Sequence, residues 1–275
     1  MVTITGFADE ISQDFVEQLE VLQSEQLNHI EFRSAWGTNV LKLTDEQLDI
    51  VKNELIHRNV NISSIGSPIG KINIKDDFES HLNDFERAIV VAKKFNVPYI
   101  RLFSFFIPDG ENPSSYRDEV INRMKELVRR AEAADIVLLH ENEKKIYGDN
   151  AERCLNLLQE CSSPHLKMAF DPANFVQCGV QPYSEAFPVL KDYIEYIHIK
   201  DALFENKMEV PAGEGDGQLI QIIKELQQAG YSGYMSIEPH LKARGKLAGM
   251  SQPQLYVTAV KALKKILEQL NYKYN

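Results

Sequence analysis

The chain has 275 residues, and 40 Asp and Glu residues against 30 Lys and Arg residues give it a formal charge of −10 at pH 7. Hydrophobic residues make up 44% and charged residues 25%, which is ordinary for a globular protein and excludes a disordered or collagen-like chain. The acidic balance counts against a general binder of nucleic-acid phosphates, because such proteins gather Lys and Arg.

The cysteines and the N-terminal residues indicate the cellular compartment in which the protein is expected. Cys154, Cys161 and Cys178 are odd in number and lack CxxC spacing, which argues against a disulfide framework and against a thiolate zinc site. The opening stretch, MVTITGFADEIS, has neither a basic region nor an apolar core of a signal peptide. No run approaches the roughly 18 apolar residues that a membrane span needs. We therefore expect a reduced, cytoplasmic protein with no membrane partner.

Short runs rich in β-branched and aromatic residues alternate along the chain with longer segments whose apolar residues recur at i, i+3 and i+4. Helix signals agree with this alternation, since Thr44 precedes one amphipathic segment as a capping residue and Gly230 follows another. In chain order the predicted strands are Val2–Gly6, His29–Arg33, Asn61–Gly66, Pro98–Phe103, Ile136–Glu141, Leu166–Asp171, Ile194–Ile199 and Tyr234–Glu238.

Eight strand starts spaced by about 33 residues suit eight βα units, and eight such units predict a closed (β/α)₈ barrel, the TIM-barrel fold. No linker or shift in composition divides the chain, so we expect one α/β domain over residues 1–275. A doubly wound open sheet is the alternative. It usually carries a glycine-rich turn after its first strand, whereas this chain has Gly6-Phe7-Ala8-Asp9-Glu10 there.

In such a barrel the functional groups lie at the C-terminal ends of the strands. The last four predicted strands end near Glu141, Asp171, His198 and Glu238. Three carboxylates and an imidazole form a ligand set that suits Mn²⁺, Mg²⁺, Co²⁺ or Zn²⁺. Without a cation, the three carboxylates would repel one another or take up protons. We therefore predict one divalent metal at these four residues, with Mn²⁺ as the first candidate.

Strand alternation places neighbouring side chains on opposite faces. If Glu141 points into the barrel, Leu139 also points inward. On the next two strands the same holds for Ala169 and Asp171, and for Tyr196 and His198. The intervening residues would then face the helices: Leu138, Phe170 and Ile197.

These residues lie in motifs that resemble the xylose isomerase-like TIM-barrel superfamily, and in particular its sugar phosphate isomerase/epimerase branch. That branch includes ketose 3-epimerases, hydroxypyruvate isomerase and inosose dehydratase, and it is related to endonuclease IV. The shared pattern covers nearly the whole chain. It consists of Glu141-Asn142 after strand five, Asp-Pro-Ala-Asn from Asp171 to Asn174, His-Ile-Lys-Asp from His198 to Asp201, Ile237-Glu238 after strand eight, and the Gly213-Glu214-Gly215-Asp216 loop.

The resemblance implies that Glu141, Asp171, His198 and Glu238 bind one divalent cation. It also implies that Glu141 and Glu238 act as acid and base on a small carbohydrate or keto-polyol, through a metal-bound enediolate. The sequence departs from the family at three positions. Asn174 stands where many members have a His, Phe204 replaces an Arg of the ketose 3-epimerases, and Tyr147 replaces a Glu. These departures weigh against a narrow assignment as a ketose 3-epimerase.

Six further residues are candidates for substrate contact because they follow predicted strands. Lys200 follows His198, although it could instead pair with Asp201 at the surface. Arg33 ends strand two above Glu31, its expected ion-pair partner. The others are Asn174, Lys71, His240 and Trp36. The Gly213–Gly217 loop superficially resembles a phosphate cradle, but the charges of Glu214 and Asp216 favour an uncharged substrate or a small keto acid.

The expected partner is therefore a small molecule, with no nucleic acid; the sequence leaves homo-oligomerisation open. The leading activity is isomerisation or epimerisation of a small carbohydrate or keto-polyol. A metal-dependent dehydratase of the inosose dehydratase type is the main alternative. Abasic-site DNA cleavage and a non-catalytic binding barrel are lower alternatives.

Overall fold

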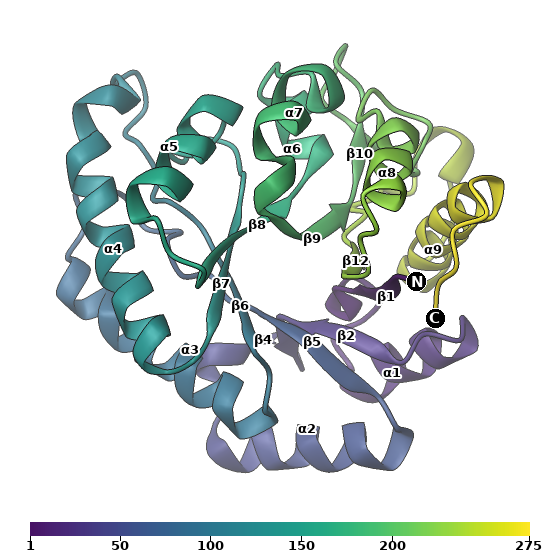
Figure 1. The fold of residues 1–275 in the computed structure, drawn as a ribbon. Coiled ribbons are helices and arrows are strands. Elements are labelled where there is room, and N and C mark those ends of the chain that lie inside the picture. Colours follow the sequence, from purple (N-terminus) through teal and green to yellow (C-terminus); the bar gives the residue numbers. More distant parts are fainter.

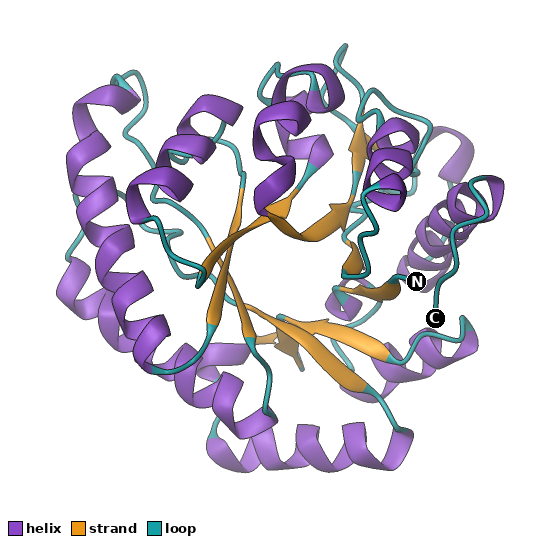
Figure 2. Cartoon of the chain, in the orientation of Figure 1, coloured by secondary structure: helices purple, strands orange, loops and turns teal.

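The computed structural model describes residues 1–275. Eight parallel strands form a nearly closed barrel, and helices surround it, as Figures 1 and 2 show. The order around the sheet is β1-β12-β9-β8-β7-β6-β5-β2, and β1 lies beside β2 where the barrel closes. The strands are β1 (Thr3–Gly6), β2 (His29–Phe32), β5 (Asn61–Gly66), β6 (Tyr99–Leu102), β7 (Val137–Glu141), β8 (Leu166–Phe170), β9 (Ile194–Ile199) and β12 (Tyr234–Ile237).

The predicted barrel is confirmed, and each strand lies within one residue of its predicted bounds. The sequence did not indicate two short hairpins on the C-terminal side of the barrel. One joins β3 (Ser34–Ala35) to β4 (Thr38–Asn39), and the other joins β10 (Asp201–Ala202) to β11 (Glu209–Val210). A strand of two residues is too short to show the alternation of polar and apolar residues from which strands are predicted.

The helices cover the outside of the barrel. Thr44 caps α2 in a reciprocal capping box with Gln47, and Asn150 caps α5. No helix is long and apolar enough to cross a membrane. The helices are α1 (Phe15–Ser24), α2 (Asp45–Arg58), α3 (Phe78–Phe95), α4 (Arg117–Ala133), α5 (Ala151–Cys161), α6 (Pro172–Gln177), α7 (Phe187–Leu190), α8 (Leu219–Gln228) and α9 (Gln252–Gln269).

The two faces of each strand enter different layers, as the alternation predicts. Leu139, Ala169 and Tyr196 pack together inside the barrel. Leu138, Phe170 and Ile197 belong instead to a core of 68 buried residues between the strands and the helices. The side chain that ends a strand on the inner face is thereby directed into the mouth of the barrel.

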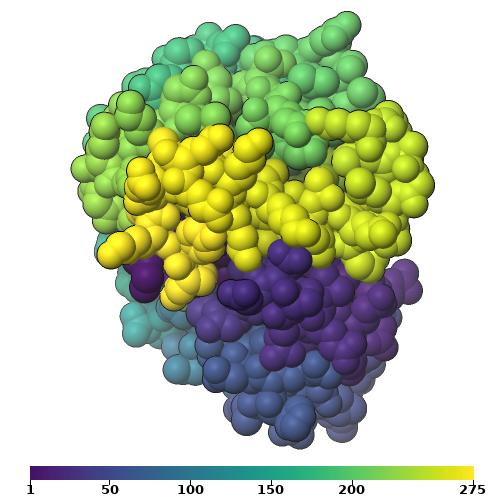
Figure 3. All heavy atoms as spheres, turned by 90° about the vertical axis from the view of Figure 1, so that its right-hand side faces the viewer, coloured from purple at the N-terminus to yellow at the C-terminus, as the bar shows by residue number.

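The two ends of the chain meet beside β1. The amide of Ile4 donates to the carbonyl of Asn275, and the amide of Val2 donates to that of Lys273. Figure 3 shows the C-terminal segment packed directly against the N-terminal residues. This contact fixes β1 and the loop after it, and that loop forms one side of the barrel mouth.

Candidate functional site

The four residues predicted as metal ligands meet at the C-terminal end of the barrel. Glu141 ends β7, Asp171 follows β8, His198 lies in β9 and Glu238 follows β12. One potential ligand atom from each lies within 4.8 Å of all the others, and all four side chains are buried. Because neighbouring parallel strands end at one rim, residues far apart in sequence become neighbours there.

Asn142, which follows the predicted metal ligand Glu141, links the ends of two neighbouring strands through its side chain. The side-chain amide of Asn142 donates to the carbonyl of Asp171 at 2.8 Å, and its side-chain oxygen accepts from the Asp171 amide at 2.9 Å. This two-way bond ties the end of β7 to the end of β8. Asp171 then uses Oδ1 to cap α6 through the amide of Asn174, at 2.8 Å, so that Oδ2 faces the cluster.

The imidazole of His198 shows that the cluster fits a metal ion. Its Nδ1 lies 3.3 Å from Glu238 Oε2, 3.5 Å from Glu141 Oε1 and 4.0 Å from Asp171 Oδ2. Neither ring nitrogen makes a well-directed hydrogen bond, although the side chain is fully buried. A buried nitrogen facing three carboxylate oxygens without such a bond is the donor arrangement that a divalent cation would satisfy.

Each of the two glutamates has its other oxygen held by an arginine. Arg101 donates to Glu141 Oε2 at 3.0 Å, and Arg33 donates to Glu238 Oε1 at 3.0 Å. Asn174 also donates to Glu141 Oε1 at 3.0 Å. Guanidinium anchors of this kind fix the orientation of a carboxylate and leave one oxygen directed into the cluster.

Lys200 lies inside the cluster rather than at the surface. Its Nζ is 2.6 Å from Asp171 Oδ2 and 3.3 Å from Glu238 Oε2, and only 2% of its side chain is exposed. The alternative pairing with Asp201 is therefore wrong. The inner-face position that Lys200 shares with His198 directs both side chains toward the same carboxylates.

The pKa values follow from burial and from this crowding of charges. Burial and Glu238 raise the pKa of Glu141, but His198 and Arg101 outweigh them and hold it at about 2. Burial raises the pKa of Asp171 to about 6, with Lys200 opposing and the two glutamates reinforcing the rise. Burial lowers the pKa of His198, yet Glu141 and Glu31 hold it well above its usual range.

One connected set of ion pairs runs through the site. When both of its imidazoles are neutral, its six carboxylates and three basic groups leave a net charge of −3, and one divalent cation would reduce this to −1. Its members are Asp9, Glu10, Glu31, Arg33, Arg101, Glu141, Asp171, His198, Lys200, Glu238 and His240.

The expected pairing of Arg33 with Glu31 is wrong. Arg33 lies at the rim and pairs with Asp9 at 2.8 Å, Glu10 at 3.5 Å and Glu238. Glu31 points deeper into the barrel, where Ser236 donates to its Oε2 at 2.6 Å and His198 Nε2 lies 3.3 Å from the same oxygen. Glu31 and Arg33 are two positions apart in the sequence, so both side chains face the inside of the barrel. Arg33 lies nearer the mouth and Glu31 lies deeper, so the two do not pair.

The remaining candidates lie around the mouth. His240 Nδ1 is 3.1 Å from Glu10 Oε1, and its Nε2 is 3.5 Å from Glu238 Oε1. Lys71 pairs with Glu143 at 3.2 Å on the opposite side. Trp36 sits in the turn of the first hairpin and packs on Phe15, with ring centroids 5.9 Å apart. It therefore belongs to the packing around that hairpin rather than to the carboxylate cluster.

The glycine-rich loop holds a carboxylate of the chain itself. Asp201 accepts from the amides of Gly213 at 2.9 Å, Gly215 at 3.1 Å and Gly217 at 2.8 Å. A Cβ on Gly215 would lie 2.4 Å from Asp201 Oδ1, so the loop closes around this side chain. The amides that a phosphate would need are thus already occupied.

Sequence reasoning did not identify Arg101 as a residue of the site. It also did not predict the contact of Glu10 with His240, the anchoring of the glycine-rich loop by Asp201, or the contact of Glu31 with His198. Arg101 had a usable signal, because it shares the inner face of β6 with Tyr99. Glu10 ends a three-residue 3₁₀ helix, Ala8–Glu10, which is too short to show a periodicity that indicates the direction of its side chains.

The chain matches the model of the xylose isomerase-like TIM barrel family over residues 19–266. The barrel is thus similar to (β/α)₈ proteins that include a probable sugar epimerase and a dehydratase. The chain belongs to the xylose isomerase-like TIM barrel family.

Two curated relatives are similar at low identity. The 3-dehydroshikimate dehydratase of Bacillus anthracis is 23% identical over 66% of this chain and 65% of the relative. The probable L-ribulose-5-phosphate 3-epimerase of Mycoplasma pneumoniae is 25% identical over 58% of this chain and 52% of the relative. The matched region thus spans less than two thirds of either relative.

Solved structures share the fold over almost the whole chain. A D-tagatose 3-epimerase-like protein has a TM-score of 0.79 at 19% identity and covers 98% of each chain. A Mycobacterium smegmatis protein in complex with magnesium has a TM-score of 0.73 at 18% identity, over 98% of this chain and 97% of that one. The IOLI protein with a bound zinc atom has a TM-score of 0.79 at 14% identity, and the match covers 98% of this chain and 99% of that chain.

Proposed function

We propose that this protein is a divalent-metal-dependent isomerase or epimerase of a small carbohydrate or keto-polyol. The observation that supports it is the pair Glu141 and Glu238. Each directs one oxygen into the cluster around His198, and each has its other oxygen anchored by an arginine.

The residues that would hold the ion are Glu141, Asp171, His198 and Glu238, and Mn²⁺ is the first candidate for this oxygen-rich set. When bound, the ion would supply Lewis-acid stabilisation of the substrate's carbonyl and alkoxide oxygens.

The two glutamates would carry the proton transfer. One accepts the proton from the carbon beside the substrate carbonyl, which leaves an enediolate. Return of a proton to the neighbouring carbon gives isomerisation, and return to the opposite face of the same carbon by the other glutamate gives epimerisation. The low pKa of Glu141 keeps it in the ionised form that can accept a proton. The Lys200 ammonium beside Glu238 is a nearby proton donor.

A metal-dependent dehydratase is the second candidate. The similarity to 3-dehydroshikimate dehydratase favours it, and so does the buried Lys200 ammonium. After a glutamate removes the proton beside the carbonyl, that ammonium could protonate a departing hydroxyl on the next carbon. Loss of water would give a conjugated product with a new ultraviolet absorbance.

Proton exchange in D₂O tests the proposal. With Mn²⁺ present, we expect a member of a panel containing D-tagatose, L-ribulose 5-phosphate and 3-dehydroshikimate to gain deuterium beside its carbonyl. Glu141→Gln and Glu238→Gln should each slow exchange by at least about 100-fold, as expected for loss of a general base. Glu152→Gln, on the exposed face of α5, is the matched control and should exchange normally. Absence of exchange across the panel with Mn²⁺, Mg²⁺, Co²⁺ and Zn²⁺ would contradict the proposal.

A further inference from the structure

Two buried phenylalanines beside the carboxylate cluster pack on charged side chains. Phe7 follows β1 and Phe103 follows β6, and both are fully buried. Neither belongs to the core of 68 residues between the strands and the helices, or to the two smaller apolar clusters. A buried phenyl ring usually joins the apolar core, so the position of these two rings has another cause.

The two rings contact three cations at the mouth of the barrel. The guanidinium carbon of Arg33 lies 4.3 Å from the centre of the Phe7 ring, and that of Arg101 lies 5.1 Å from it. Arg101 also lies 4.5 Å from the centre of the Phe103 ring, and the ammonium of Lys71 lies 4.1 Å from it. Each ring thus contacts two cations, and Arg101 contacts both rings. The negative face of a phenyl ring attracts a cation, most strongly where water is excluded.

Arg101 is held mainly by the two rings. Its guanidinium has one hydrogen-bond partner, Glu141 Oε2 at 3.0 Å, and its Nε is buried without a partner. A single hydrogen bond leaves a guanidinium free to turn about the donating group, whereas stacking on two ring faces restricts that rotation. The rings therefore set the direction from which Arg101 meets Glu141.

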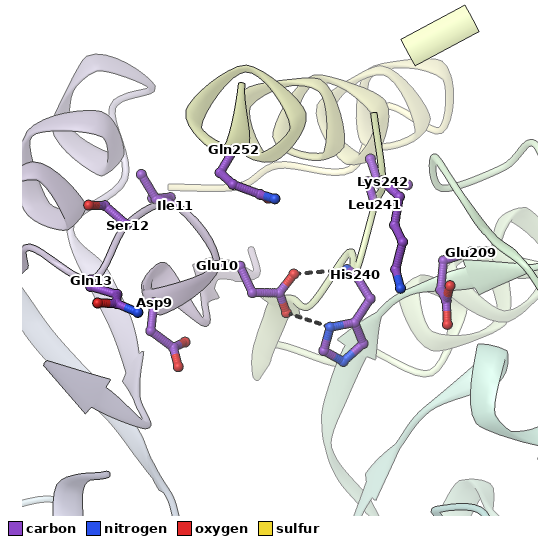
Figure 4. Close-up of a pocket in the computed structure, with 10 residues that line it drawn as sticks. All are labelled: Asp9, Glu10, Ile11, Ser12, Gln13, Glu209, His240, Leu241, Lys242 and Gln252. Atoms are coloured by element: carbon purple, nitrogen blue, oxygen red, sulfur yellow. Dashed lines mark hydrogen bonds and ion pairs between the residues drawn. The ribbon is translucent and has the colours of Figure 1, made fainter. Parts of the chain in front are cut away.

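Arg33, in contrast, is held by three carboxylates. It pairs with Asp9, Glu10 and Glu238. Glu10 is fixed in turn by His240, whose amide donates to Oε2 at 2.8 Å and whose Nδ1 lies 3.1 Å from Oε1, as the dashed lines in Figure 4 mark. The Arg33 guanidinium is therefore a fixed surface for the ring that stacks on it.

The backbone at the end of β5 leaves room for the Phe7 ring. A Cβ on Gly66 would lie 2.6 Å from Phe7 Cε1 and 3.1 Å from Arg33 Cβ, so a side chain there would displace the ring. His198 also contacts the ring edge to face, with centroids 5.4 Å apart and planes at 76°. Phe7 thus touches one predicted metal ligand and both of the arginines that anchor the glutamates.

We propose that Phe7 and Phe103 are positioning residues, whose ring faces hold the Arg101 guanidinium in place. Through Arg101 the two rings orient Glu141, one of the two glutamates proposed to transfer protons. The effect on the reaction rests on the proposed function, whereas the effect on Arg101 does not.

The ¹⁵Nε–¹Hε signal of Arg101, assigned by its loss in Arg101→Lys, measures whether the rings hold the guanidinium. We expect an order parameter of about 0.85 in the wild type, as for rigid backbone, and below about 0.6 in Phe7→Leu and in Phe103→Leu. A trifluorinated phenylalanine at either position keeps the ring but withdraws negative charge from its face, so it should also lower the order parameter. Phe85→Leu is the matched control, because Phe85 is fully buried in the apolar core.

Proton exchange in D₂O at saturating Mn²⁺ measures the effect on the reaction. Phe103→Leu should lower kcat for exchange by at least about tenfold, since a misplacement of about 1 Å can cost about 100-fold. It should change KM by less than about threefold, because the buried ring does not touch substrate. The fluorinated variants should change kcat in the same direction, and Phe85→Leu should exchange like the wild type.

The fluorinated variants separate a role of the ring face from simple filling of space. An order parameter unchanged in both the leucine and the fluorinated variants would overturn the proposal, and so would an unchanged kcat in both. A loss in the leucine variants alone would also overturn it, because the rings would then only fill space. If a leucine variant does not fold, the fluorinated variant decides. A wild type that catalyses no exchange would contradict the proposed function, and the order parameter would still decide whether the rings hold Arg101.

Discussion

Glu31 is expected to control metal affinity without touching the metal. Its Oε2 lies 3.3 Å from His198 Nε2, on the side of the ring opposite the carboxylate cluster, and both side chains are fully buried. Ser236 donates to the same oxygen and holds it in place. A carboxylate in this position fixes the ring so that Nδ1 faces the metal, and partners of this kind change metal affinity by about 10- to 100-fold.

Glu31→Ala should therefore weaken Mn²⁺ or Co²⁺ binding by about 10- to 100-fold, or about 1.4–2.7 kcal/mol. Glu31→Gln keeps an acceptor for Nε2 but loses the charge, so its loss should be smaller. Titration calorimetry measures both affinities, and circular dichroism checks that the metal-free variants are folded. Long-range ¹⁵N spectra of the histidine rings report whether His198 keeps its protonation pattern.

The matched control is Ser64→Ala. Ser64 is paired with Glu31 in the β2–β5 register and is fully buried, and its hydroxyl has no hydrogen-bond partner. It should leave metal affinity unchanged. If Glu31→Ala binds metal as tightly as the wild type while folded, the role assigned to Glu31 is refuted.

Three further predictions concern protons and the glycine-rich loop. Because His198 has its pKa held well above the usual range and a ligand nitrogen must be unprotonated, metal affinity should rise with pH from 6 to 8; an affinity independent of pH would contradict this. Burial lowers the pKa of His140 to about 4, so the unfolded chain takes up a proton below pH 6.5 before the folded one does. The free energy of unfolding, measured by urea titration, should therefore fall by about 3 kcal/mol more between pH 7 and pH 4 in the wild type than in His140→Gln. Equal decreases in the two proteins would contradict this prediction. Asp201→Ala leaves three amides without their acceptor, so hydrogen exchange at Gly213, Gly215 and Gly217 should quicken by at least tenfold, and unchanged protection would refute the anchoring role.

The parts of the fold that local patterns encode could be predicted from the sequence. Alternation in Val137–Glu141 places Leu139 and Glu141 on one face, and this alone directs the glutamate into the barrel. The 33-residue spacing of strand starts then brings the four strand ends to one rim. Strand alternation depends only on neighbouring residues, and the spacing of the strands depends on one repeated βα unit, so both can be recognised in the sequence.

The partners of those residues could not be predicted, because they come from across the barrel. Glu31 and Ser236 are 205 positions apart, and so are Arg33 and Glu238. Nothing near Arg33 in the sequence shows that its guanidinium turns to Glu238 rather than to Glu31. Asp201 likewise finds its partners 12 to 16 positions along, in a loop without periodicity.

An anomalous difference map of Mn²⁺-loaded crystals tests the central claim most directly. The account predicts one strong peak bounded by Glu141, Asp171, Glu238 and the Nδ1 atom of His198. A peak elsewhere, or no peak at these four residues at saturating Mn²⁺, would contradict it.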